Sequence, residues 1–117
     1  MDNIDFNKEL IKDLSLEKVV SLKQMKLVLY SADWCGMCKA LKANLHKDRP
    51  ICQLTIYTGT SENQDEFLDK TENLNIKHLP TLILYKDDKE TEEITRWNGI
   101  IKTNVINDYI INYLNNE

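Results

Sequence analysis

Two cysteines with two residues between them stand in the stretch Ala32-Asp33-Trp34-Cys35-Gly36-Met37-Cys38-Lys39. The run before it, residues 26–31 (KLVLYS), is apolar and rich in strand formers, and its lack of alternation suits a strand covered on both faces. After the cysteines, Leu41 and Leu45 fall at helical spacing, and Pro50 ends that pattern at the latest. We therefore expect both cysteines where a strand passes into a helix.

This junction suits thiol–disulfide chemistry. A thiolate attacks a disulfide sulfur and forms a mixed disulfide, which a second thiol must resolve without rearranging the backbone. Cys35, in or just before the first helical turn, faces unpaired backbone N–H groups and the positive end of the helix dipole, which stabilise a thiolate. Lys39 adds a positive charge nearby, and Gly36 leaves the approach to both sulfurs open. Cys38 lies one turn further in, so we predict Cys35 as the nucleophile and Cys38 as the less exposed, resolving thiol.

The remaining sequence continues to alternate strand and helix patterns. Strands separated by helices pair in parallel through crossovers, whereas the short Asp87-Asp88 turn forces an antiparallel hairpin. An α/β fold follows, with a mixed sheet that has helices on both faces. The further expected strands are residues 53–58, 81–86 and 92–97, and the further expected helices are residues 9–14, 16–22, 61–74 and 103–114. Ser15 would cap the second of these helices, and Ser61 with Gln64 would form a capping box for the third. The last helix would face water with Asn104, Asn107, Asp108 and Asn112.

Length and composition narrow the class of protein. With 117 residues, 42% of them hydrophobic, the chain is expected to form a single domain over residues 1–117. Its net charge of -4 argues against nucleic-acid binding, and no apolar run approaches the roughly 18 residues of a membrane span. Three cysteines are too few for a disulfide framework, and residues 1–10 have no apolar core of a signal peptide. We therefore expect a cytoplasmic monomer that binds neither nucleic acid nor membrane.

The residues Trp34 to Lys39, at a strand-to-helix junction in this topology, resemble the thioredoxin family. The similarity extends to His78-Leu79-Pro80-Thr81, which matches the family's cis-proline, and to Asn98-Gly99, which resembles the loop forming the third wall of its substrate groove. The resemblance implies a thioredoxin-like fold, a redox-active disulfide between Cys35 and Cys38, and a role in electron transfer and cell redox homeostasis. It also implies that substrate contacts Trp34, Gly36, Met37, Leu79, Pro80, Asn98 and Gly99.

Three residues depart from the family's pattern. Leu29 stands where the family usually keeps a buried aspartate that moves a proton to and from the resolving thiol. Gln53 replaces the lysine that partners this aspartate, and Met37 replaces the proline between the cysteines. We expect the fold to survive these changes and the rate and redox poise to be altered.

The leading hypothesis is a protein-disulfide reductase that draws its electrons from a partner reductase, because the sequence shows no flavin or nicotinamide site of its own. Two alternatives stay open at this point. Leu29 allows a docking subunit that binds without turning over disulfides, and Met37 allows an oxidant or isomerase. A zinc site that adds Cys52, His46 or His78 to the paired cysteines is disfavoured, because the chain has no second close pair of ligands, so no metal or other cofactor is expected.

Overall fold

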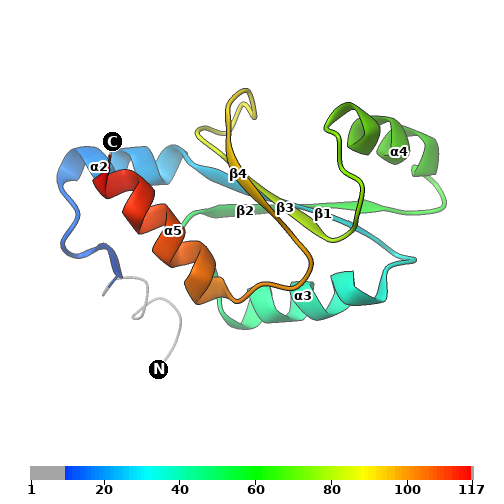
Figure 1. The fold of residues 1–117 in the computed structure, drawn as a ribbon, viewed down its shortest axis with the longest axis horizontal. Helices are drawn as coiled ribbons and strands as arrows, with labels where there is room; N and C mark the ends of the chain where they lie inside the picture. Colours follow the sequence, from blue (N-terminus) through cyan, green and yellow to red (C-terminus); the bar gives the residue numbers. More distant parts are fainter. Residues whose placement is uncertain (1–9, 117) are drawn as a thin grey trace.

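A computed structural model describes residues 10–116 of the chain (Figure 1). The order of strands and helices predicted from the sequence is confirmed, with the ends displaced by a few residues. Of the helix expected over residues 9–14, residue 9 lies outside the described residues, whereas Leu10 and Ile11 are helical. The elements are α2 (Leu16–Gln24), β1 (Lys26–Ala32), α3 (Gly36–Lys47), β2 (Gln53–Gly59), α4 (Gln64–Asn73), β3 (Thr81–Tyr85), β4 (Glu93–Asn98) and α5 (Thr103–Asn115).

The strands form one mixed sheet in the order β2-β1-β3-β4. β1 and β2 are parallel, because α3 carries the chain back between them, whereas β3 pairs antiparallel with both β1 and β4. β1 is therefore central, and every residue of it except the first is buried. Its uninterrupted apolar run, which predicted a strand covered on both faces, is thereby explained.

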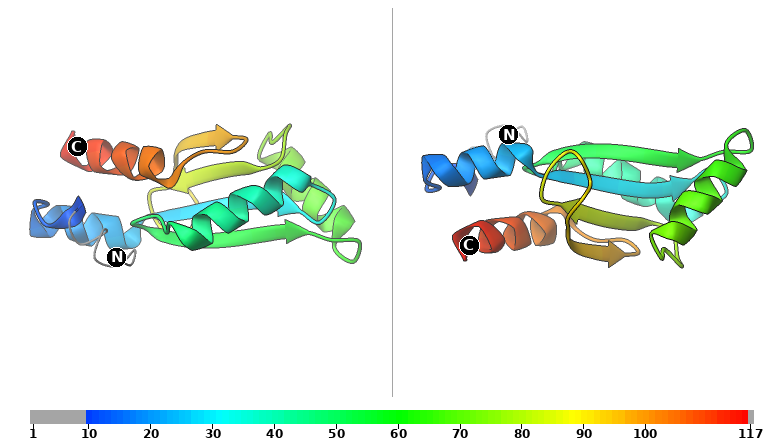
Figure 2. Two further views of the ribbon diagram at one scale, coloured as in Figure 1. Left: turned by 90° about the horizontal axis from the view of Figure 1, so that it is seen from below. Right: turned by 90° about the horizontal axis from the view of Figure 1, so that it is seen from above.

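Helices cover both faces of the sheet, as the sequence predicted. Figure 2 shows α3 against one face and α4 against the other, with α2 and α5 side by side at one end. Alternate side chains of β1 point to the two faces, so Leu27 and Leu29 join the core under α3 while Val28 and Tyr30 join the core under α4. The first core also takes Leu41 and Leu45 from α3 and Ile106, Ile110 and Leu114 from α5, and the second takes Phe67 from α4.

The predicted orientation of α5 is wrong at three residues. Asn107 was expected in water but is 1% exposed, and Val105 and Tyr109, whose spacing puts them on the apolar side with Ile106 and Ile110, lie on the surface. The Asn107 Oδ1 accepts a hydrogen bond of 2.9 Å from the backbone N–H of Ile51. A polar side chain is buried here because the segment entering β2 has a backbone donor that needs an acceptor.

The predicted capping box of α4 is also wrong. The helix begins at Gln64 after Asn63, and Ser61 is exposed before it. The Asn63 side chain is engaged with the preceding loop: its Oδ1 accepts from the Thr60 N–H at 2.7 Å, and its Nδ2 donates to the Thr58 carbonyl at 3.1 Å. These bonds fix the turn from β2 into α4, which sequence spacing alone did not reveal.

Gly59 provides a test of the packing between β2 and α4. A Cβ at this position would lie 2.6 Å from Cδ2 and 2.8 Å from Cγ of Phe67, so the ring would have to move. We expect Gly59→Ala to lower the free energy of unfolding in urea by about 1–3 kcal/mol, the usual cost of overpacking. Gly36→Ala is the matched control, because nothing lies within 4 Å of its added Cβ. Equal stability of the two variants would contradict this account.

Candidate redox-active site

The two cysteines lie at the start of α3, as the strand-to-helix interpretation of the sequence required. Cys35 is the N-cap residue, and its Sγ accepts a hydrogen bond of 3.2 Å from the Cys38 N–H. The Cys35 N–H in turn donates to the Ala32 carbonyl at 3.1 Å, which closes the turn between β1 and α3. The helix thus directs an otherwise unpaired N–H at the Cys35 sulfur, an arrangement that stabilises a thiolate.

Cys35 and Cys38 form a disulfide, and their Cα atoms are 5.3 Å apart. The two residues differ in exposure: the Cys38 side chain is fully buried between α3 and the sheet, whereas Cys35 is half-buried. An external sulfur therefore reaches Cys35 before Cys38. This difference fits the predicted division into an attacking and a resolving thiol.

Four of the residues expected to form the groove, Leu79, Pro80, Asn98 and Gly99, lie together around the start of β3. The Leu79–Pro80 peptide is cis, and Leu79 packs against the core under α4, as Cys35 does. The Gly99 N–H donates to the Pro80 carbonyl at 2.9 Å, with Gly99 at a φ of 83° that favours glycine. The Asn98 Oδ1 lies 2.8 Å from the Thr81 hydroxyl, which joins this loop to the start of β3.

Two large apolar side chains of the motif remain accessible. Trp34 and Met37 are each 52% exposed, and Gly36 between the cysteines has open space where a Cβ would lie. The Trp34 ring stands edge-on to Phe67 with centroids 6.0 Å apart, and Phe67 stacks on Tyr57 at 5.5 Å. The sequence pattern places residue 67 only within a helix, because the contact of Phe67 with Trp34 depends on how α4 packs against the sheet.

Three residues singled out in the sequence remain: Lys39, Leu29 and Gln53. Lys39 is exposed, and among the described residues no hydrogen bond or ion pair joins it to either cysteine. Leu29 is fully buried in the core under α3. The pairing of Leu29 with Gln53 is wrong: Leu29 lies opposite Ile56, and Gln53 lies opposite Lys26 at the far end of β1. Parallel register, which the sequence did not fix, accounts for this difference.

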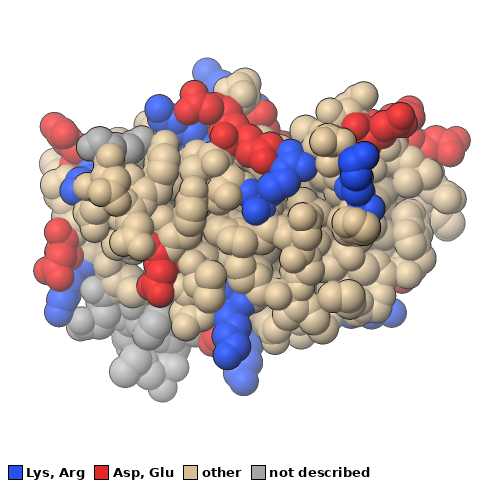
Figure 3. Space-filling view, in the orientation of Figure 1, with Lys and Arg blue, Asp and Glu red and all other residues tan. Residues whose placement is uncertain are grey.

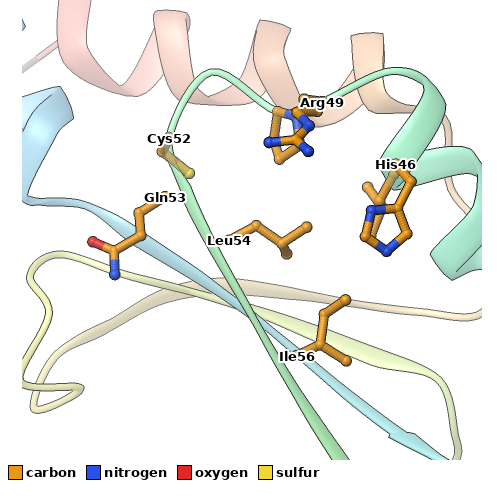
Figure 4. Close-up of a pocket in the computed structure, with 8 residues that line it drawn as sticks. His46, Arg49, Cys52, Gln53, Leu54 and Ile56 are labelled. Atoms are coloured by element: carbon orange, nitrogen blue, oxygen red, sulfur yellow. The ribbon is translucent and has the colours of Figure 1, made fainter.

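A cavity lies at the C-terminal end of α3, away from the two cysteines (Figure 4). The cavity has a volume of about 310 Å³ and is lined by Leu45, His46, Arg49, Pro50, Cys52, Gln53, Leu54 and Ile56. His46 is eleven residues along the helix from Cys35, about 16 Å at the usual rise per residue. Cys52 and His46 therefore do not join Cys35 and Cys38 in one site, and over residues 10–116 no three His, Cys, Asp or Glu side chains gather in a metal-binding arrangement.

The charged side chains are mixed in sign on the face shown in Figure 3, with Lys and Arg beside Asp and Glu and a largely uncharged centre. None of the helices within residues 10–116 is both long enough and apolar enough to cross a bilayer.

Comparisons with known proteins give one family. A family model described as Thioredoxin matches residues 7–112. The thioredoxin of Chlamydia caviae is 32% identical over 88 residues, which cover 73% of this chain and 83% of that protein. The mitochondrial thioredoxin-2 of Schizosaccharomyces pombe is 32% identical over 75 residues, 64% of this chain, and the match spans only about half of that relative, 55% of its length.

Solved structures agree in fold. A mutant thioredoxin from Halobacterium salinarum has a TM-score of 0.60 at 22% identity, covering 85% of this chain and 82% of that one. Thioredoxin f2 of Chlamydomonas reinhardtii also has a TM-score of 0.60, at 20% identity, covering 97% and 93%. The predicted α/β thioredoxin fold is thereby confirmed.

The third cysteine gives a pH-dependent prediction. Burial raises the pKa of the Cys52 thiol to about 12, so at pH 8 almost none of the reactive thiolate is present in the folded protein. We expect iodoacetamide at that pH to modify Cys35 of the reduced native chain and to leave Cys52 unmodified, as read by peptide mass spectrometry. In urea, where the pKa returns to its ordinary value, Cys52 should react. Modification of Cys52 at the rate of Cys35 before unfolding would contradict its burial.

Proposed function

The chain belongs to the thioredoxin family, whose members are protein-disulfide oxidoreductases, and on this premise we propose that it reduces protein disulfides in the cytoplasm. The observation that carries the proposal is the Cys35–Cys38 pair, with a half-buried sulfur at the N-cap of α3 and a fully buried one a turn later. We propose a single domain acting as a monomer, re-reduced by a partner reductase.

The reaction follows from the two positions. The Cys35 thiolate attacks a substrate disulfide, forming an intermolecular S–S bond as the substrate bond breaks and releases one thiolate. Cys38 then attacks the Cys35 sulfur, closes the disulfide and releases the second substrate thiolate. Two electrons pass to the substrate, and the two protons of the dithiol balance the two thiols that form. The helix N–H groups around Cys35 stabilise the thiolate that begins the cycle.

Substrate would lie extended across the groove. No hydrogen bond among the described residues uses the Leu79 N–H or carbonyl, so this backbone is available to pair with an added strand. Trp34 and Met37 would offer exposed apolar contact next to Cys35, and the loop of Asn98 and Gly99, bonded to Pro80, would form a further wall. The open space at Gly36 would leave room for substrate between the cysteines, and Lys39 would contribute positive charge at the rim.

Covalent trapping tests the assignment of the two cysteines. We expect Cys38→Ser to accumulate mixed disulfides with model protein disulfides through Cys35, because the resolving thiol is gone. Cys35→Ser is the matched control and should trap nothing. The adducts would be separated on non-reducing gels and mapped by mass spectrometry. Adducts formed equally by the two variants would count against Cys35 as the nucleophile.

The direction of the reaction requires a separate measurement. A reductase should reduce insulin disulfides and show a potential near the roughly -270 mV of thioredoxin in dithiothreitol buffers. Met37 keeps a backbone N–H at the second position of α3, where a proline would have none, so Met37→Pro removes one donor near Cys35 and should make the couple more reducing. A wild-type potential nearer the roughly -120 mV of DsbA would identify an oxidant instead.

A further inference from the structure

We propose that Lys42, anchored by Thr58 and Ser31, is a positioning residue that promotes ionisation of Cys38 in the resolving step. This inference rests on the roles of Cys35 and Cys38 in the proposed function. Position 29, where the family usually keeps an aspartate that serves the resolving thiol, is a buried leucine here. We therefore look for the group that favours ionisation of Cys38 on α3 itself, where Lys42 is a cation.

Lys42 is held at the level of the cysteines. It follows Cys38 by four residues on α3, which places the two on neighbouring positions of one helix surface. Helical side chains lean toward the N-terminus, so the Lys42 chain runs back toward Cys38. Its ammonium donates to the Thr58 Oγ1 at 3.1 Å, and that hydroxyl lies 3.2 Å from the Ser31 Oγ. Ser31 is fully buried, faces Thr58 in the β1–β2 register, and lies four residues before Cys35.

The anchoring groups leave the charge of Lys42 intact. Thr58 and Ser31 are neutral hydroxyls, so they fix the ammonium without cancelling it, as a carboxylate would. A positive charge within about 4–6 Å of an acidic group favours its ionised form, and the effect is strong where water is excluded. Cys38 is fully buried, a setting that otherwise disfavours its thiolate.

Within residues 10–116, the other groups around Cys38 do not offer an alternative cation. Lys39, His46 and Lys47 on α3 itself are exposed, as are Asp33 before it, Asp48 and Arg49 beyond it, and His78 in the loop before β3, while the buried Cys52 thiol lies at the far end of the helix. The sheet and α5 present uncharged side chains to this side of α3: Leu27, Leu29 and Ser31 from β1, Leu54, Ile56 and Thr58 from β2, Leu82 and Leu84 from β3, and Ile106 and Ile110 from α5.

The step balances without a further reactant. In the mixed disulfide, the Cys38 thiol loses its proton to water, and its thiolate attacks the Cys35 sulfur. The Cys35–Cys38 bond forms, the bond from Cys35 to the substrate sulfur breaks, and the departing thiolate takes up a proton. Lys42 takes no part in the proton transfer, and its positive charge raises the fraction of Cys38 that is ionised at neutral pH.

Two-phase kinetics test this inference. Reduced protein carrying Cys52→Ala is mixed with 5,5′-dithiobis(2-nitrobenzoate) in a stopped-flow instrument over a range of pH. Attack by Cys35 releases the first coloured thiolate, and resolution by Cys38 releases the second. We expect Lys42→Met to move the pH midpoint of the second phase upward and to slow that phase at neutral pH by about tenfold for each pH unit of the shift. The first phase should keep its midpoint.

Three further variants make the outcome specific. Lys42→Arg keeps the charge and should restore the second phase, and Thr58→Val, which removes the anchor, should shift it part of the way. Lys47→Met is the matched control, removing an exposed lysine from the far end of the same helix, and should leave both phases unchanged. An unshifted second phase in Lys42→Met, or an equal shift in Lys47→Met, would overturn the inference alone. A single released thiolate in the parent protein would overturn the role of Cys38 as well.

Discussion

The hydrogen bond from the Cys38 N–H to the Cys35 sulfur is the contact on which the chemistry of this protein depends. A helix leaves its first N–H groups without partners, and here a cysteine takes the N-cap position that serine, threonine, aspartate or asparagine usually fill. The same geometry that completes the helix therefore places a thiolate-stabilising field at the more accessible of two sulfurs. Because β1 is buried on both faces, the position of this helix start is fixed by the core of the molecule.

Packing on the opposite face supports the groove around that sulfur. Phe67 from α4 packs directly over Gly59, stacks on Tyr57 and makes an edge-to-face contact with the Trp34 ring. Cys35 and Leu79 pack against the same core, so one set of apolar contacts holds the Cys35 sulfur and the backbone proposed to bind substrate. Because these contacts are close-packed, we expect changes in the packing of α4 to reach Trp34 and Cys35.

Beneath α3 the molecule combines an apolar floor with one anchored cation. Leu29 contributes to the core and offers no group that could accept a proton. Lys42 and its two hydroxyl partners lie at the edge of that floor, where the ends of β1 and β2 meet the helix. In the proposed mechanism Lys42 acts on the resolving cysteine, whereas the Cys38 N–H acts on the attacking one.

The sequence by itself determined the alternation of strands and helices, the placement of both cysteines at the start of a helix, and the α/β class, because apolar periodicity and the breaks at Pro50 and Asp87-Asp88 are local properties of the chain. Only the tertiary structure decided the β1–β2 register, which moved Gln53 away from Leu29, and the burial of Asn107 against the Ile51 N–H. It alone also brought Phe67 under Trp34 and Lys42 onto Thr58. These contacts join residues distant in sequence, and their geometry depends on how whole elements pack, which no local pattern encodes.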